Sequence, residues 1–432
     1  MKNLRLLWIP VVLVVIVFAG WWWHAHTTQE SSALIEGQDV NAVLKDPAVI
    51  AKGHYLATVG DCMSCHTEQG GAPYAGGRVI ATPFGNIPVP NITPDPDPEH
   101  GIGRWSVDDF WRALHTGIGH DGEKLYPVFS YTSFTKTTRE DAIAIFAYLQ
   151  SVPPVAQAPK PLDLNFPYNV RSTLTAWRAL YFKPGVYKPD PAQSEEWNRG
   201  AYLVQGLGHC NECHAQRDAW GGLLGNATLS GGRIPVQDWY APDLSTQANG
   251  GMQGWTQQDI IDLLKTGRSS KGAAFGPMAD VIVNSTQYLH DDDLHAIATY
   301  LQSLPARPKP PVVPPSFDSA SLVSRGRDVY AKQCADCHSD NGAGMPGVYP
   351  TLDGNSSVVE PTGINAARAV LLGGFAPLTQ GNPRPYSMPP YAQQLSDADV
   401  AAVVTYIRQA WSNRAPAVEE RDVAAYRHTP VD

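Results

Sequence analysis

The sequence predicts a mainly α-helical protein in which three tandem domains follow one N-terminal transmembrane anchor. Three observations lead to this fold class. A pentapeptide of the pattern Cys-x-x-Cys-His occurs three times, helical segments precede and follow each copy, and proline-rich stretches separate the units. The length of 432 residues suits about three domains, because one domain usually takes about 100–200 residues.

Lys2 and Arg5 precede an apolar run from Leu6 to Trp23. Its 18 residues would span about 27 Å as a helix, which nearly matches a bilayer core. Trp21 to Trp23 resemble an interfacial aromatic anchor and stand where a signal peptide would place small residues for cleavage. We therefore expect an uncleaved anchor over residues 1–27, with a cleaved signal peptide as the alternative. In both cases the remainder would lie on the periplasmic side of the inner membrane.

The pentapeptides Cys62–His66, Cys210–His214 and Cys334–His338 carry the groups that attach haem covalently. Two thiols three residues apart can each add to a haem vinyl group, and the adjacent histidine then reaches the iron. A redox-active cysteine pair or half of a zinc site would not explain a histidine after every pair. The sequence therefore predicts three class I cytochrome c domains with three covalently bound haem c groups. The predicted attachment residues are Cys62, Cys65, Cys210, Cys213, Cys334 and Cys337, and the predicted iron ligands are His66, His214 and His338.

The repeats and the proline-rich stretches divide the chain into segments. We expect domain 1 over 46–152, a linker with an aromatic helix over 153–191, domain 2 over 192–304, a proline-rich linker over 305–317, domain 3 over 318–412 and a C-terminal tail over 413–432. The aromatic segment from Phe166 to Pro191 could either pack between domains or face a partner.

Each domain is expected to close by the crossing of two helices. The first helix carries a glycine, and the last carries a tyrosine at a matching place in all three units. A glycine opposite an aromatic residue allows two helices to cross closely over a haem. The three pairs are Gly53 with Tyr148, Gly200 with Tyr300, and Gly326 with Tyr406.

A low-spin haem usually has a second axial ligand, and a methionine thioether raises its potential. Met388 lies just before the last helix of domain 3, and Met278 has the matching location in domain 2. We expect these two methionines to be ligands in preference to Met345 and Met252, which lie in glycine-rich loops.

Domain 1 has no methionine at the corresponding place. Met278 follows Trp255 by 23 residues, and the same spacing from Trp105 falls on Val128, beside Phe129. The first haem is therefore expected to be five-coordinate or bound by histidine. The nearby candidates are His115 and His120.

Domains 1 and 2 repeat each other more closely than domain 3. Gly76-Gly77-Arg78 matches Gly231-Gly232-Arg233, so the two domains resemble a duplicated pair. Arg78 and Arg233 could pair with haem propionates, since guanidinium groups suit carboxylates, or could form surface salt bridges.

The formal net charge of −9 argues against nucleic-acid binding. The sequence also has no convincing nucleotide-binding loop, flavin fingerprint, molybdenum site or hydrolytic triad. Substrate oxidation is therefore expected on another subunit.

Residues 46 to 412 resemble the membrane-bound triheme cytochrome c subunits of bacterial periplasmic dehydrogenases. The motifs that carry the resemblance are Pro83–Ile87, Asn91–Pro96, Gly101–Ser106, Leu125–Pro127 and Glu196–Val204. The resemblance implies that three haems relay electrons from a catalytic dehydrogenase subunit to ubiquinone or a terminal oxidase. That subunit would be a molybdenum and iron–sulfur protein, a quinoprotein or a flavoprotein.

One departure from the family pattern bears on the partner. The alcohol and polyol branches usually carry Tyr-Pro-Ala-Met-Pro-Tyr where this chain has Tyr126 to Tyr131 with Phe129 at the methionine position. Phenylalanine there, and the segment Trp177–Phe182, are similar to cytochromes of molybdenum hydroxylases. The resemblance thus favours a molybdenum-containing aldehyde dehydrogenase, with a quinoprotein alcohol or flavin gluconate or polyol dehydrogenase as the alternative. A different alternative is a haem enzyme with an open, peroxidase-like first haem.

Overall fold

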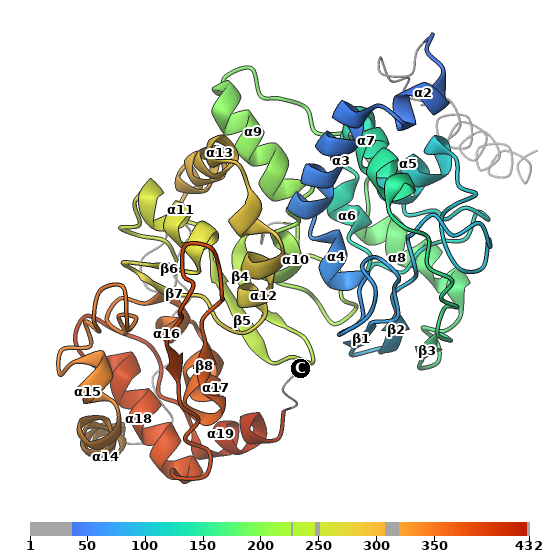
Figure 1. The fold of residues 1–432 in the computed structure, drawn as a ribbon. Helices are drawn as coiled ribbons and strands as arrows, with labels where there is room; N and C mark the ends of the chain where they lie inside the picture. Colours follow the sequence, from blue (N-terminus) through green and yellow to red (C-terminus); the bar gives the residue numbers. More distant parts are fainter. Residues whose placement is uncertain (1–36, 226–227, 247–250, 307–318, 430–432) are drawn as a thin grey trace, which may run out of the picture.

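The computed structural model describes residues 37–225, 228–246, 251–306 and 319–429, and this part of the chain is mainly helical (Figure 1). The predicted anchor over 1–27 and most of the predicted linker over 305–317 lie outside the described residues. Within the described ranges, no helix combines the length and the apolar character that a membrane span needs.

Domain 1 is a set of helices with one small sheet at its edge. Its elements are α2 (Val40–Leu44), α3 (Pro47–Val59), α4 (Cys62–Cys65), β1 (Val79–Thr82), β2 (Gly85–Pro88), α5 (Val107–Thr116), α6 (Tyr131–Phe134) and α7 (Arg139–Ser151). Strand β3 (Asp163–Leu164) of the following linker completes the antiparallel sheet in the order β1-β2-β3, with Val79 opposite Pro88 and Gly85 opposite Leu164.

Domain 2 repeats this plan. Its elements are α9 (Glu195–Gln205), α10 (Asn211–His214), β4 (Ser230–Ile234), β5 (Trp239–Asp243), α11 (Gln257–Thr266), β6 (Arg268–Ser269), β7 (Gly272–Ala273), α12 (Pro277–Asn284), the 3-10 helix η2 (Thr286–Tyr288) and α13 (Asp291–Gln302). The predicted duplication extends to the helix caps. Ser106 and Asp109 form a capping box at the start of α5, and Thr256 and Asp259 form the same box at the start of α11.

Domain 3 packs around a separate core and is completed by the residues that follow it. Its elements are α14 (Ser319–Gln333), α15 (Ala335–His338), α16 (Ser356–Val359), α17 (Ile364–Leu372), β8 (Gly374–Phe375), β9 (Ser387–Met388) and α18 (Asp397–Gln409). The predicted C-terminal tail contains α19 (Glu420–Arg427), whose Val423 is fully buried in this core.

The helix crossings confirm the predicted glycine–tyrosine pairs in all three domains. The first helices α3, α9 and α14 cross the last helices α7, α13 and α18. A Cβ atom on Gly53 would overlap with the carbonyl oxygen of Ala144 and lie 2.9 Å from Cβ of Tyr148. Gly200 meets Ala296 and Tyr300 in the same way, and Gly326 meets Ala402 and Tyr406. Glycine is therefore required at each crossing, because the two backbones touch there.

The aromatic linker packs between domains and also leaves apolar groups exposed. It contains the 3-10 helix η1 (Arg171–Thr173) and α8 (Leu174–Tyr181). In α8, Trp177 Nε1 donates to the carbonyl of Trp220 (3.0 Å), and Tyr181 donates to Asp218 (2.5 Å), so the linker holds a loop of domain 2. Phe166 and Leu180 are 81% and 76% exposed.

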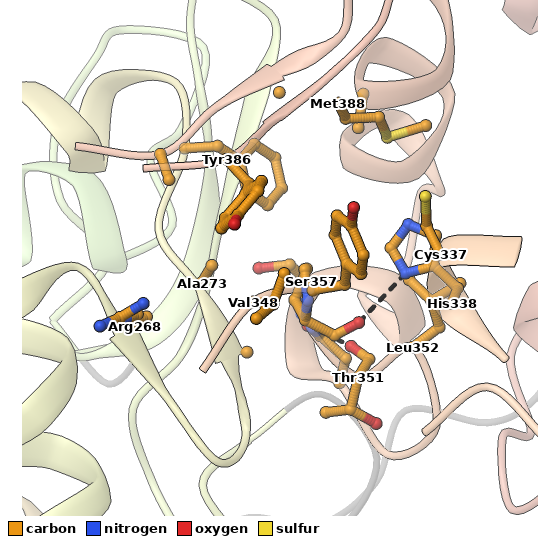
Figure 2. A pocket seen from close by; sticks show the side chains of 18 of the residues that line it. Arg268, Ala273, Cys337, His338, Val348, Thr351, Leu352, Ser357, Tyr386 and Met388 are labelled. Atoms are coloured by element: carbon orange, nitrogen blue, oxygen red, sulfur yellow. Dashed lines mark hydrogen bonds between the residues drawn. The ribbon is translucent and has the colours of Figure 1, made fainter. Parts of the chain in front are cut away.

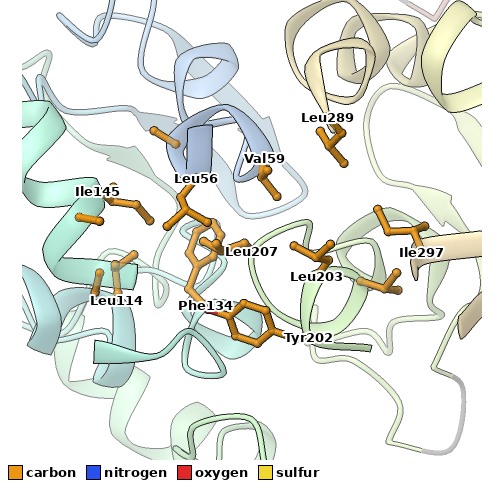
Figure 3. Close-up of a cluster of buried hydrophobic side chains, with 14 of the residues drawn as sticks. Leu56, Val59, Leu114, Phe134, Ile145, Tyr202, Leu203, Leu207, Leu289 and Ile297 are labelled. Carbon is orange, nitrogen blue, oxygen red and sulfur yellow. The ribbon is translucent and has the colours of Figure 1, made fainter. Parts of the chain in front are cut away.

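Domains 1 and 2 share one hydrophobic core, which Figure 3 shows as a continuous cluster from Leu56 and Val59 of α3 to Leu203 and Leu207 near α9. Two tyrosine–aspartate hydrogen bonds connect the domains reciprocally. Tyr55 of domain 1 donates to Asp293 of domain 2 (2.5 Å), and Tyr202 of domain 2 donates to Asp141 of domain 1 (2.6 Å). Since these residues occupy matching positions, the duplicated domains pack around a local two-fold relation.

Both reciprocal hydrogen bonds are partly or fully buried. Burial alone would raise the pKa of the Asp293 carboxyl, but hydrogen bonds from Arg199 and Tyr55 lower it. Burial also raises the pKa of the Tyr55 and Tyr202 hydroxyls, so both remain protonated donors.

Replacing Tyr55 or Tyr202 with phenylalanine should therefore destabilise the pair of domains. We expect each variant to lose about 1–2 kcal/mol, because a buried carboxylate loses one donor. Denaturant unfolding followed by haem absorbance would measure the loss. Tyr288→Phe is a suitable control, since Tyr288 is 50% exposed. Equal effects in the control and the two interface variants would contradict the proposed interface role.

Candidate haem-binding sites

The three motifs lie on short helices that follow the first helix of each domain, namely α4, α10 and α15. In each motif, histidine Nδ1 is within hydrogen-bond distance of a proline carbonyl oxygen. The distances are 2.8 Å from His66 to Pro90, 2.7 Å from His214 to Pro242, and 3.1 Å from His338 to Pro350.

This hydrogen bond prepares each imidazole to bind a metal. An Nδ1–H group that donates to a carbonyl fixes the tautomer and leaves Nε2 as the lone-pair donor. Burial lowers the pKa of all three imidazoles, although the proline carbonyl opposes it, so each ring is held in the neutral form that ligates iron. These hydrogen bonds were not predicted from the sequence. The proline lies 24, 28 or 12 residues after the histidine, and so irregular a spacing gives no recognisable pattern.

The third motif opens into a cavity of about 600 Å³ (Figure 2). Cys334, Cys337, His338 and Met388 all line it, and most of the remaining lining is apolar. Strand pairing holds Met388 in place, because it lies opposite Gly374 in the β8–β9 pair. Two thiols, an imidazole and a thioether around an apolar cavity fit a covalently attached haem, with His338 and Met388 as the predicted axial ligands.

In domain 2, Met278 is the second residue of α12 and is partly buried. Gly276, two residues before Met278, adopts φ 56°, and a Cβ atom added there would contact the ring of Trp239. Met252 lies instead in the shared core at 7% exposure, and Met345 is 50% exposed in its loop. Met278 therefore stays the predicted ligand of the second haem.

In domain 1, Phe129 packs against Phe134 with ring centroids 5.4 Å apart. His115 Nδ1 is 3.0 Å from the carbonyl oxygen of Thr135, and its ring stacks on Trp111. His120 Nδ1 is 3.0 Å from Asp109 Oδ2 in the capping box of α5. Both imidazoles thus have a protein partner at Nδ1. His115 and His120 both remain predicted candidates for the second axial ligand of the first haem iron.

The two candidate propionate partners differ in their surroundings. Arg78 Nη1 donates to the carbonyl of Ser64 inside the first motif (2.6 Å). Arg233 pairs with Asp238, with Nε 2.9 Å from Oδ1, and its side chain is 57% exposed. Arg233 therefore forms a surface ion pair, which was the alternative to propionate binding. Arg78 contacts the first motif directly and remains a predicted propionate partner.

The first and second motifs lie close together at the interface of domains 1 and 2. The hydroxyls of Thr132 and Ser133 in α6 both donate to Glu212 Oε1 in the second motif (3.1 Å each). Reciprocally, α12 of domain 2 packs against α4, which carries the first motif. Burial raises the pKa of the Cys213 thiol to about 11, and interactions with Glu212 and with Cys65 of the first motif act in the same direction.

Asp61, the residue before the first motif, is a partly buried carboxyl at this interface. It adopts φ 49° and accepts a hydrogen bond from Ser64 Oγ (2.5 Å). Burial raises its pKa to about 7, and Asp280 of α12 adds to this, whereas Ser64 and Arg78 oppose it.

This carboxyl should make the potential of the neighbouring haem depend on pH. Above about pH 7, Asp61 is ionised, and its negative charge favours ferric iron, so the potential should fall as pH rises through 7. Potentiometric titrations between about pH 5 and pH 9 would measure this slope. Asp61→Asn should flatten it, while the exposed loop variant Asp121→Asn should not. If the potential of the Asp61→Asn variant still depends on pH to the same extent, the proton that controls it is bound by another group.

Comparison with known proteins gives a consistent result. Residues 198–305 and 323–411 match the Cytochrome c family. The chain is 40% identical to the cytochrome c subunit of alcohol dehydrogenase (quinone) from Gluconobacter oxydans, over 89% of this chain and 83% of that protein. It is 38% identical to the gluconate 2-dehydrogenase cytochrome c subunit of Pantoea cypripedii, over 91% of this chain and 94% of that protein.

A third relative matches over part of its length only. It is a subunit of nicotinate dehydrogenase from Pseudomonas putida, and it is 40% identical over 86% of this chain. The match covers 31% of that protein, so most of the relative has no counterpart in this chain.

Proposed function

The chain belongs to the family of cytochrome c subunits of bacterial dehydrogenases, and from this we propose that it relays electrons through three haem c groups. The electrons would come from a catalytic dehydrogenase subunit and pass to membrane quinone or a terminal oxidase. We place the haem domains on the periplasmic side of the inner membrane, where the predicted anchor would hold them. The haem supplies the redox chemistry when bound, and the protein supplies position and potential.

One observation carries this proposal. Three Cys-x-x-Cys-His motifs each hold a histidine by the same hydrogen bond from Nδ1 to a proline carbonyl, which favours the neutral form of the ring. Two of these motifs lie at one domain interface, and the third opens into a cavity whose wall includes domain 2. This arrangement suits electron transfer between neighbouring haems.

The relatives support the alternative partner, which is a quinoprotein alcohol dehydrogenase or a flavin gluconate or polyol dehydrogenase. The quinone-dependent alcohol and gluconate subunits match along 83% and 94% of their length, whereas the nicotinate relative matches along 31% of its length. We therefore propose a quinoprotein alcohol or flavin gluconate or polyol dehydrogenase as the partner. One residue favours the other partner. Phe129 stands where the alcohol and polyol branches carry methionine, and phenylalanine at this position is similar to the cytochromes of molybdenum hydroxylases, such as a molybdenum-containing aldehyde dehydrogenase.

Detergent purification of the full chain from its native membrane would test both levels of the proposal. We expect a catalytic subunit to co-elute in stoichiometric amount and its substrate to reduce all three haems. Pyrroloquinoline quinone or flavin in the complex would support the proposed partner, and molybdenum would overturn it. Purification without any dehydrogenase subunit would overturn the relay itself.

Val128 and Phe129 favour a second candidate function, in which the open first haem binds a small ligand or reduces peroxide. Near-infrared magnetic circular dichroism should show methionine–iron charge-transfer intensity for two haems and not three. Rapid carbon monoxide binding by one reduced haem at neutral pH would support the open site. Failure to bind carbon monoxide would mean that all three irons have two axial protein ligands.

A further inference from the structure

The cavity of the third haem is not built by domain 3 alone. Domain 2 contributes its β6–β7 hairpin, whose residues Arg268, Ser269, Gly272 and Ala273 line the same cavity as His338. Figure 2 shows Cys337 and His338 on one side of the cavity and Arg268 and Ala273 on the other. Among the described lining residues, Arg268 is the one arginine or lysine.

This placement has a chemical consequence for a haem attached at the third motif. The vinyl groups that bond to cysteine and the two propionate carboxylates stand on opposite edges of the haem. If the thioether edge is attached at Cys334 and Cys337, the carboxylate edge would face the opposite side of the cavity, where domain 2 supplies Arg268. A guanidinium group binds carboxylates through two parallel hydrogen bonds.

We propose that Arg268 of domain 2 binds a propionate of the haem held by domain 3. This inference rests on the proposed attachment of a haem to the third motif. The arginine would thereby couple haem attachment in one domain to the docking of the other.

Contacts around the hairpin already hold Arg268 at the domain boundary. Its Nη1 donates to the carbonyl of Gly347 in domain 3 (2.5 Å), and a guanidinium has further donors for a carboxylate. Thr379 of domain 3 donates to the carbonyl of Thr266, two residues earlier (3.1 Å). The nearby lining carboxylate Asp262 accepts from Gln258 (2.7 Å) on its own helix.

The positive charge should raise the potential of the third haem, because it opposes the charge of ferric iron and compensates the propionate. In Arg268→Gln, we expect the reduction equilibrium of this haem to shift about tenfold toward the ferric form, which is about 59 mV for one electron. The potential should also become more dependent on pH near neutrality, since the propionate loses its cation. Arg268→Lys should shift less, because it keeps the charge.

The experiment is a potentiometric titration of the full chain after its three haems have been counted. The third haem is first identified as the component that moves in Met388→Leu. Arg384→Gln is the control, because Arg384 is an exposed arginine of domain 3, which holds the third motif, and lies outside the cavity lining. A shift no larger than that of the control, or a shift in another component, would overturn the inference. If Met388→Leu shifts none of the three redox transitions, the assignment of Met388 as an axial ligand in the proposed function is wrong instead.

Discussion

Replacement of Gly200 by alanine is expected to prevent domain 2 from closing normally around its haem. The added Cβ would overlap with the carbonyl oxygen of Ala296 and lie 2.8 Å from Cβ of Tyr300. Neither group can move away easily, because both belong to the crossing helix α13. We expect a loss of about 3 kcal/mol in unfolding free energy, since overpacking costs more than the roughly 1 kcal/mol that alanine gains in helix propensity.

Denaturant unfolding would measure the free energy, and a pyridine haemochrome assay would show whether the second haem is still incorporated. Gly53→Ala and Gly326→Ala should behave alike, because the same overlap occurs at each crossing. Gly185→Ala is the control, since an added Cβ there meets nothing within 4 Å. A Gly200→Ala protein as stable as the control would mean that the helices can separate without loss.

These crossings illustrate which parts of the fold could be predicted from the sequence. Each glycine–tyrosine pair recurs at a fixed place in its repeat, so three copies reveal the pattern without knowledge of the partner atoms. The reciprocal pairing of Tyr55 with Asp293 and of Tyr202 with Asp141 carried no such signal. Tyr55 and Asp293 are 238 residues apart, and a tyrosine or an aspartate on a helix is ordinary by itself.

The haem sites show the same division. Cysteines and histidines adjacent in sequence identify the attachment sites directly, because five consecutive residues carry the chemistry. The proline carbonyls that orient the histidines were missed, since a backbone acceptor is the same for every residue type. The wall that β6–β7 adds to the third cavity was missed because it depends on how two domains dock.

Replacing Met388 with leucine should change the third haem more than any other single substitution outside the Cys-x-x-Cys-His motifs. Leucine is close to methionine in volume, so the fold should tolerate the change. The iron would lose the soft thioether that stabilises its ferrous state. We expect the reduction equilibrium to shift at least about a hundredfold toward the ferric form, equivalent to about 120 mV.

Near-infrared magnetic circular dichroism gives the direct measurement, because the methionine–iron charge-transfer intensity should fall by the share of one haem. Met345→Leu is the matched control, since Met345 lies in the same domain but is 50% exposed in its loop. Met278→Leu should remove the remaining intensity from the second haem. Loss of the band in Met345→Leu, with retention in Met388→Leu, would exchange the roles of these two methionines. Since Met388 is held opposite Gly374 in the β8–β9 pair on the cavity wall, we expect the loss to occur in Met388→Leu.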